Sequence, residues 1–217
     1  MIKAVIFDFD GTLANRQDYA TQELRKFAHI CFPDLEEDSI EMECIVQDLI
    51  NWDAFGNMNK TIIAKNLKKK YKSTFDENLF REWWLEHMVE YVSLFDDTID
   101  VLEYLKPKYK LAILTNGDSK AQWGKVNLSG VDSYMDYIIA SGDIGIHKPD
   151  IRIFQHVCQR LDVKPEECIF VGDTFSTDIL GAYNAGMTPI WIWNDPNRIS
   201  KFPVKRIYSL IELKEIL

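Results

Sequence analysis

Two aspartates near the start of the chain, Asp8 and Asp10, are the residues best placed to do chemistry. They follow an apolar run over residues 2–7 that only Lys3 interrupts, and Gly11 lets the backbone turn sharply after them. A continuous apolar run of this length is typical of a strand buried on both faces of a parallel sheet. Ligands of open α/β sheets bind at the carboxyl ends of the strands, where both carboxylates would stand. From this stretch alone, a plain Asp-Gly turn with solvated carboxylates explains the pattern equally well.

Three stretches later in the chain repeat this arrangement, with polar residues at or after the end of an apolar run. They are Thr115 with Asn116 after residues 111–114, Lys148 after residues 137–140, and Asp173 with Asp178 after residues 168–171. The carboxyl ends of parallel strands lie on one side of a sheet, so we expect these side chains to converge on one site. The combination is much more specific than any one of its members.

These residue types together indicate a particular chemistry. Carboxylates gathered in one place repel one another and raise one another's pKa, and a hard divalent cation such as Mg²⁺ removes that conflict. Lys148 would add a positive charge, while the Thr115 hydroxyl and a backbone N–H at a strand end could hold phosphate oxygens. A carboxylate, a metal, a lysine and phosphate donors are the groups required for phosphoryl transfer through an aspartyl-phosphate.

Helical patterns separate the apolar runs in the second half of the chain. Helices are expected over about residues 97–106, 119–127, 150–161 and 176–185, with further strands over 189–193 and 206–208 and a terminal helix. Strands that alternate with helices predict an α/β fold, a Rossmann-like doubly wound parallel sheet covered on both faces.

Residues 15–95 interrupt this alternation with helical periodicity and no convincing strand. Four helices are expected there, the last from about residue 76 to 95. About eighty residues of helix are too many for a simple crossover between two strands. The predicted organisation is therefore a Rossmann-like catalytic core of residues 1–14 and 96–217, with residues 15–95 inserted as an α-helical cap domain.

The composition limits the kinds of binding partner and the cellular location that we expect for this protein. The formal net charge of −9 disfavours binding to nucleic acid, because an acidic surface repels a phosphate backbone. The four cysteines have neither metal-site nor disulfide-framework spacing, which indicates thiols in a reducing compartment. No signal peptide and no apolar run of membrane-spanning length is recognisable. We therefore expect a cytoplasmic protein without a membrane partner.

The sequence resembles the haloacid dehalogenase superfamily, in the branch whose helical cap is inserted after the first motif. The matching stretches are Asp8-Phe9-Asp10-Gly11-Thr12-Leu13, Thr115-Asn116-Gly117, Lys148-Pro149-Asp150, and Gly172-Asp173-Thr174 with Asp178. The resemblance covers the whole α/β core. In the cap it covers only position and helical character.

The resemblance implies roles for the aspartates at the strand ends. Asp8 would attack phosphorus as the nucleophile, and Asp10 would protonate the leaving alcohol and then activate the hydrolytic water. Asp8, the backbone carbonyl of Asp10, and Asp173 would hold Mg²⁺. The dehalogenases of the superfamily attack carbon without a metal and lack an acid at the position of Asp10, so this residue favours phosphate chemistry.

The remaining site residues would support that reaction. Asp178 would orient metal-bound water or Lys148 without itself binding the metal. Lys148 would neutralise Asp8 and the phosphate. Thr115 and the Asn116 N–H would bind phosphate oxygens.

The expected function is a Mg²⁺-dependent phosphatase that hydrolyses a small phosphorylated metabolite, a phosphomonoester, through an aspartyl-phosphate. Two alternatives remain open: a phosphomutase on the same core that isomerises a sugar phosphate, and a non-catalytic binding protein of this fold. Hydrolysis is favoured by the Thr12 hydroxyl and by the absence of a recognisable sugar-specific cap pattern. A non-catalytic protein is disfavoured, because a site that had lost its activity would have no physical reason to retain mutually repelling carboxylates.

Overall fold

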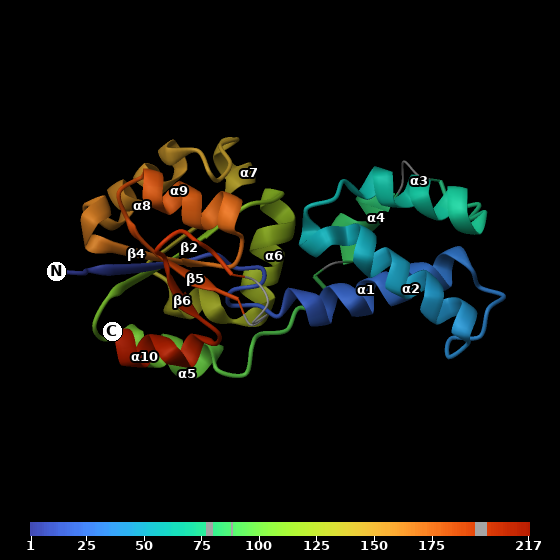
Figure 1. The fold of residues 1–217 in the computed structure, drawn as a ribbon, viewed down its shortest axis with the longest axis horizontal. Helices are drawn as coiled ribbons and strands as arrows, with labels where there is room; N and C mark the ends of the chain where they lie inside the picture. The colour runs from blue at the N-terminus through green and yellow to red at the C-terminus, as the bar shows by residue number, and fades with distance from the viewer. Residues whose placement is uncertain (77–79, 88, 194–198) are drawn as a thin grey trace. The chain divides into compact units, whose positions relative to one another are not determined.

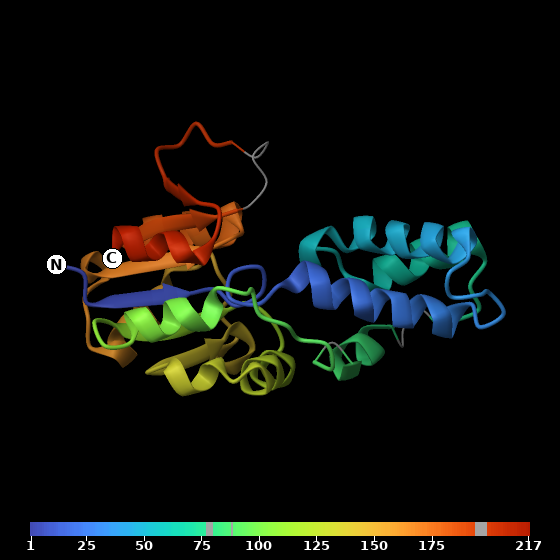
Figure 2. The same ribbon diagram turned by 90° about the horizontal axis from the view of Figure 1, so that it is seen from below.

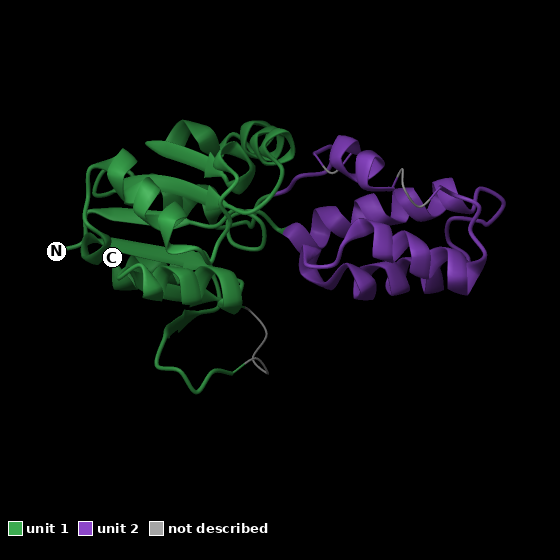
Figure 3. Cartoon of the chain, turned by 90° about the horizontal axis from the view of Figure 1, so that it is seen from above, with its two compact units in different colours: residues 1–15, 94–217 green, residues 16–93 purple. Residues whose placement is uncertain are grey.

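The computed structural model describes residues 1–76, 80–87, 89–193 and 199–217. The chain divides into two compact units, which Figure 3 shows in different colours. Unit 1 comprises residues 1–15 and 94–217, and unit 2 comprises residues 16–93.

Unit 1 contains a parallel β-sheet with the strand order β3-β2-β1-β4-β5-β6. The strands are β1 (Ala4–Phe7), β2 (Lys110–Thr115), β3 (Tyr137–Ala140), β4 (Cys168–Gly172), β5 (Thr188–Ile192) and β6 (Lys205–Ile207). Every pairing between them is parallel, which confirms the predicted α/β fold. The chain winds outward in both directions from β1, so the ends of β1 and β4 form the switch point at which such sheets bind ligands.

Helices cover both faces of this sheet (Figures 1 and 2). One face carries α8 (Ile151–Leu161) and α9 (Leu180–Asn184), and the other carries α5 (Thr98–Leu105) beside α10 (Leu213–Ile216). Burial on both faces explains the continuous apolar runs, because alternate residues of a strand point to opposite sides. In β1, Ala4 and Ile6 belong to the core beneath α8.

The remaining described helices and turns complete unit 1. They are α6 (Ser119–Ser129), α7 (Ser141–Ile144), a π-helix (Phe175–Ile179), and 3₁₀ turns at Val131–Tyr134, Pro165–Glu167 and Leu210–Glu212. The helix expected over residues 176–185 is therefore a π-helix that continues into α9.

All the regular elements in the described residues of unit 2 are helices, joined by turns. The unit contains α1 (Arg16–Cys31), α2 (Ile40–Asp53), a 3₁₀ turn (Ala54–Gly56), α3 (Lys60–Tyr71) and α4 (Phe80–His87). The prediction that the last helix runs to residue 95 was wrong, because α4 ends at His87 and turns follow; residues 77–79 and 88 lie outside the description. No helix in the described part of the chain is long and apolar enough to cross a membrane.

Glu23 on α1 is a buried acid in an unusual environment. Its side chain is fully buried, and neither carboxylate oxygen has a hydrogen-bond partner among the described residues. Burial raises the pKa of Glu23 to about 7, an effect that Lys26 opposes and Glu90 reinforces. Because the pKa of Glu23 is higher in the folded than in the unfolded protein, proton binding by this side chain stabilises the fold. The stabilisation is complete below about pH 4.5 and is lost as the pH rises through about 7.

We therefore expect Glu23→Gln to be more stable than the wild type at pH 8, by about 1–3 kcal/mol, because no unpaired charge is then buried. The advantage should shrink at pH 5, where the wild-type carboxyl keeps its proton. Urea unfolding at both pH values measures this. The exposed Glu36→Gln variant is the matched control and should show no such pH dependence. An equal difference at the two pH values would contradict the assignment.

Candidate active site

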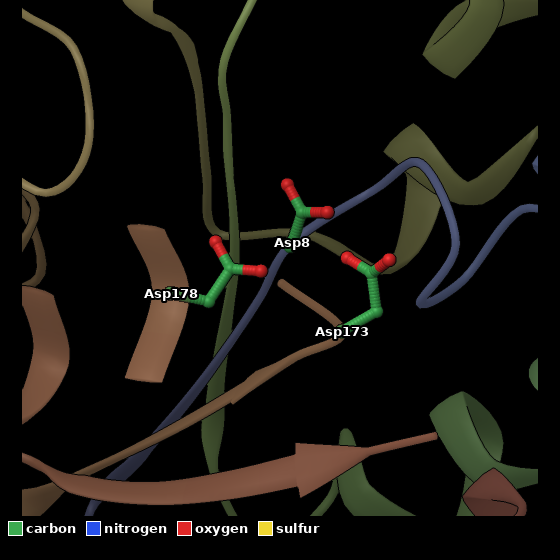
Figure 4. Close-up of side chains that lie close together, drawn as sticks. All are labelled: Asp8, Asp173 and Asp178. Carbon is green, nitrogen blue, oxygen red and sulfur yellow. The ribbon is translucent and has the colours of Figure 1, made fainter. Parts of the chain in front are cut away.

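Three aspartates meet where β1 and β4 end. Asp8 follows β1 directly, and its backbone N–H donates to the carbonyl of Val171 in β4 at 2.9 Å. Asp173 follows β4, and Asp178 lies on the π-helix after it. Figure 4 shows their carboxylates pointing toward one another, and one oxygen of each lies within 4.8 Å of the others. All three side chains are buried.

Two glycines make room for these acids. Gly11 has φ +86°, and a Cβ there would lie 2.7 Å from Oδ2 of Asp173. A Cβ at Gly172 would lie 2.5 Å from the Cβ of Asp178. Both positions therefore require glycine, since real side chains do not approach this closely. The glycines of the motifs set the position of the carboxylates.

Lys148 is the cation of this cluster. Its Nζ lies 2.6 Å from Oδ1 of Asp8 and 2.8 Å from Oδ1 of Asp178, and it donates to the carbonyl of Leu114 at 2.9 Å. The residue is 4% exposed. Burial opposes its charge, but the carboxylates of Asp178 and Asp8 raise the pKa of Lys148 above the ordinary lysine value. Lys148 therefore stays protonated and links two of the three acids.

One lysine does not balance three carboxylates. Burial raises the pKa of Asp8 to about 7; Lys148 counteracts this in part, and Asp178 adds to it. Burial together with the charges of Asp178 and Asp8 raises the pKa of Asp173 well above its ordinary value. A divalent cation would relieve this repulsion, and carboxylate oxygens are ligands that Mg²⁺ prefers. The donor set therefore fits Mg²⁺.

Asn116 positions the segment that carries Lys148. Its Oδ1 accepts a hydrogen bond from the Lys148 N–H at 2.8 Å, and its Nδ2 donates to the Lys148 carbonyl at 3.0 Å. This pair of bonds joins the end of β2 to a residue 32 positions later in the chain. The Asn116 side chain is therefore engaged with Lys148, which leaves only its backbone N–H for the predicted contact with phosphate.

Asp10 and Thr115 are joined by a residue that the sequence did not point to. Gln122 of α6 donates through Nε2 to Oδ2 of Asp10 at 3.0 Å and to the Thr115 hydroxyl at 2.7 Å. Lys125 of the same helix forms an ion pair with the same oxygen of Asp10. Only their spacing could have signalled them: two polar residues, three apart, on a helix that begins just after the Thr115-Asn116-Gly117 stretch.

The structure thus places the predicted site residues in two connected groups. Asp8, Lys148, Asp173 and Asp178 form the buried charge cluster. Asp10, Thr115 and Asn116 meet through Gln122, whose Nε2 also donates to the Asn116 carbonyl at 2.7 Å, and Asn116 binds Lys148 in turn. Such an arrangement can hold a cation and an anion side by side at a switch point of a parallel sheet.

Known proteins resemble this chain over part or all of its length. A model of the haloacid dehalogenase-like hydrolase family matches residues 2–186. The glyceraldehyde 3-phosphate phosphatase of Methanothermobacter thermautotrophicus is 30% identical over 100% of both chains. The N-acylneuraminate-9-phosphatase of Mus musculus is 37% identical over 64% of this chain and 56% of its own.

Solved structures of the same family share the fold of this chain. The HAD-hydrolase YfnB of Bacillus subtilis, whose crystal structure was determined bound to magnesium, superposes with a TM-score of 0.82 at 25% identity, over 100% of this chain and 98% of its own. A HAD phosphatase from Thermococcus onnurineus superposes with a TM-score of 0.68 at 27% identity, over 99% and 97% of the two chains. By its matching family model, its full-length relative and its fold, the chain belongs to the haloacid dehalogenase-like hydrolases.

Proposed function

We propose that this hydrolase is a Mg²⁺-dependent phosphatase of a small phosphorylated metabolite. The observation that carries the proposal is the buried Asp8 carboxylate, paired with Lys148 and facing Asp173 at the switch point. The phosphatase names of the relatives and the magnesium bound by YfnB support it. The four cysteines, all free thiols, are consistent with a cytoplasmic location.

In the proposed reaction Asp8 is the nucleophile and Asp10 the acid and base. An oxygen of Asp8 bonds to phosphorus while the bond from phosphorus to the leaving oxygen breaks, and Asp10 gives that oxygen its proton. A water molecule then attacks the phosphorus of the aspartyl-phosphate and loses a proton to Asp10. The bond between Asp8 and phosphorus breaks, so both aspartates return to their initial state and inorganic phosphate is released.

Charge compensation is the main requirement of this reaction. A carboxylate approaching a phosphate dianion at ~3 Å meets strong repulsion, and more so in a site with little water. Asp8, the backbone carbonyl of Asp10, and Asp173 would hold Mg²⁺, which would neutralise part of the phosphate charge. Lys148 supplies the other positive charge, and Asp178 orients it through the contact at 2.8 Å.

Two further parts of the chain complete the proposal. The Thr115 hydroxyl and the Asn116 N–H would bind phosphate oxygens at the end of β2. Residues 15–95 would serve as a cap domain that excludes bulk water during the transfer and selects the leaving group.

Removal of the metal tests the proposal. We expect excess chelator to lower phosphate release from a phosphometabolite panel or an aryl phosphate at least ~100-fold, and added Mg²⁺ to restore it, because the carboxylates then lack their counterion. Mg²⁺ should also raise the unfolding temperature of the metal-free protein, since it binds the folded site. Full activity in excess chelator would contradict the metal assignment.

The same assay separates the alternatives. Isomerisation of a sugar phosphate with little net phosphate release would indicate a phosphomutase. Stabilisation by Mg²⁺ without cleavage of any panel member would indicate a binding protein.

A further inference from the structure

Lys125 occupies an exceptional position for a lysine. It is fully buried on α6, and its ammonium group forms an ion pair with Oδ2 of Asp10. The Nζ atom also lies 5.8 Å from the centre of the Phe9 ring. A lysine is almost never fully buried unless it is paired, because removing its charge from water is costly. Lys125 is therefore held in place through its contact with Asp10.

Gln122 donates to the same carboxylate oxygen from one turn earlier on α6. It is 3% exposed, and its Nε2 also reaches the Thr115 hydroxyl and the Asn116 carbonyl. Space for it depends on Gly117, where φ is +150° and a Cβ would lie 2.9 Å from Cγ of Gln122. The glycine in the loop after β2 thus leaves room for the Gln122 side chain.

The helix that carries both donors is anchored next to the site. Asp118 caps α6 by accepting from the Ala121 N–H at 3.2 Å, immediately after Gly117. Residues three apart share one face of a helix, so Gln122 and Lys125 are presented together. Two donors on one oxygen fix the rotation of the Asp10 carboxylate, which a single contact would not do.

We propose that Lys125 and Gln122 are positioning residues that hold the Asp10 carboxylate in the orientation required for proton transfer. The inference rests on the proposed function, in which Asp10 protonates the leaving oxygen as its bond to phosphorus breaks and later accepts a proton from the attacking water. General acid–base catalysis depends on this geometry, because a misplaced acid loses much of its effect. The two buried lysines then have separate roles: Lys148 pairs with the Asp8 carboxylate, and Lys125 pairs with the Asp10 carboxylate.

The leaving group makes the proposal testable. Departure of 4-nitrophenolate needs little protonation, whereas an alkyl alkoxide needs a proton from Asp10. We expect Lys125→Met to lower kcat for alkyl phosphates ~100-fold with KM nearly unchanged. With 4-nitrophenyl phosphate the first transfer should stay fast while hydrolysis slows. A burst of about one nitrophenolate per enzyme should then appear in stopped-flow absorbance, as it should with Asp10→Asn.

Controls separate positioning from loss of structure. Lys120→Met changes an exposed lysine on the same helix and should behave as the wild type. Circular dichroism and the unfolding temperature verify folding. If Lys125→Met does not fold, Gln122→Leu, which keeps the lysine, should give the same pattern with a smaller loss.

Two results would overturn the inference. Wild-type kinetics in a folded Lys125→Met or Gln122→Leu would do so, as would an equal loss on alkyl and aryl phosphates without a burst. Either result leaves the phosphatase assignment intact. A wild-type protein that cleaves neither class of ester would refute the proposed function itself, and the positioning role with it.

Discussion

Asp8→Asn is expected to abolish turnover, lowering kcat by ~10⁴-fold or more, without unfolding the protein. Asparagine has the shape of aspartate but lacks a nucleophilic carboxylate, so no aspartyl-phosphate forms. The fold should tolerate the change, because burial raises the pKa of Asp8 and the substitution removes a carboxylate that repels Asp173 and Asp178. Release of inorganic phosphate at saturating substrate and Mg²⁺ measures the loss, and urea unfolding measures the stability.

Asp162→Asn is the matched control for this substitution. Asp162 is exposed at the end of α8 with φ +53°, a left-handed conformation that asparagine adopts readily. Activity should remain at the wild-type level in this variant. Substantial turnover by a folded Asp8→Asn protein would exclude Asp8 as the nucleophile.

Lys148→Met should be the most damaging substitution for stability and activity together. It leaves the carboxylates of Asp8 and Asp178 buried without their cation, which we expect to lower the free energy of unfolding by about 3–5 kcal/mol. Turnover should fall as well, because the phosphate loses a neutralising charge. Urea unfolding without metal, followed by phosphate release with Mg²⁺, measures both effects.

Two further variants provide comparisons for the expected effects of Lys148→Met. Lys106→Met removes a partly exposed ion pair with Asp136 and should change stability by no more than about 1 kcal/mol. The double variant Lys148→Met with Asp178→Asn should recover part of the lost stability, because one unpaired carboxylate is gone, but little activity. A Lys148→Met protein as stable as Lys106→Met would show that the buried pairs carry little energy.

The core and its charge cluster were predictable from sequence for physical reasons. Strands buried on both faces must be almost wholly apolar, so β1 and β4 stand out, and polar residues after them lie at the edge where parallel strands end. Pairing of β1 with β4 then brings Asp8 and Asp173 together. This prediction required only that the two strands be parallel, because the carboxyl ends of parallel strands lie at the same edge of a sheet.

Features that depend on tertiary contacts could not be read in this way. Asp178 was expected in the site, but the sequence did not show how it is held there. It lies on a π-helix, whose backbone hydrogen bonds span one residue more than those of an α-helix, and its carboxylate accepts a hydrogen bond from the Thr174 N–H at 2.9 Å. Periodicity does not distinguish the two kinds of helix. Lys125 and Glu23 would be taken for solvent-facing charges on helices, and only packing shows that both are buried.

The central claim is that phosphate passes through a covalent bond to Asp8. Rapid quenching during turnover, followed by borohydride reduction and peptide mass spectrometry, tests it most directly, because reduction converts an aspartyl-phosphate into homoserine. We predict homoserine at position 8 in the presence of substrate and Mg²⁺, and aspartate there when either is omitted. Sustained phosphate release with unmodified aspartate at position 8, or with homoserine only at another position, would contradict the account.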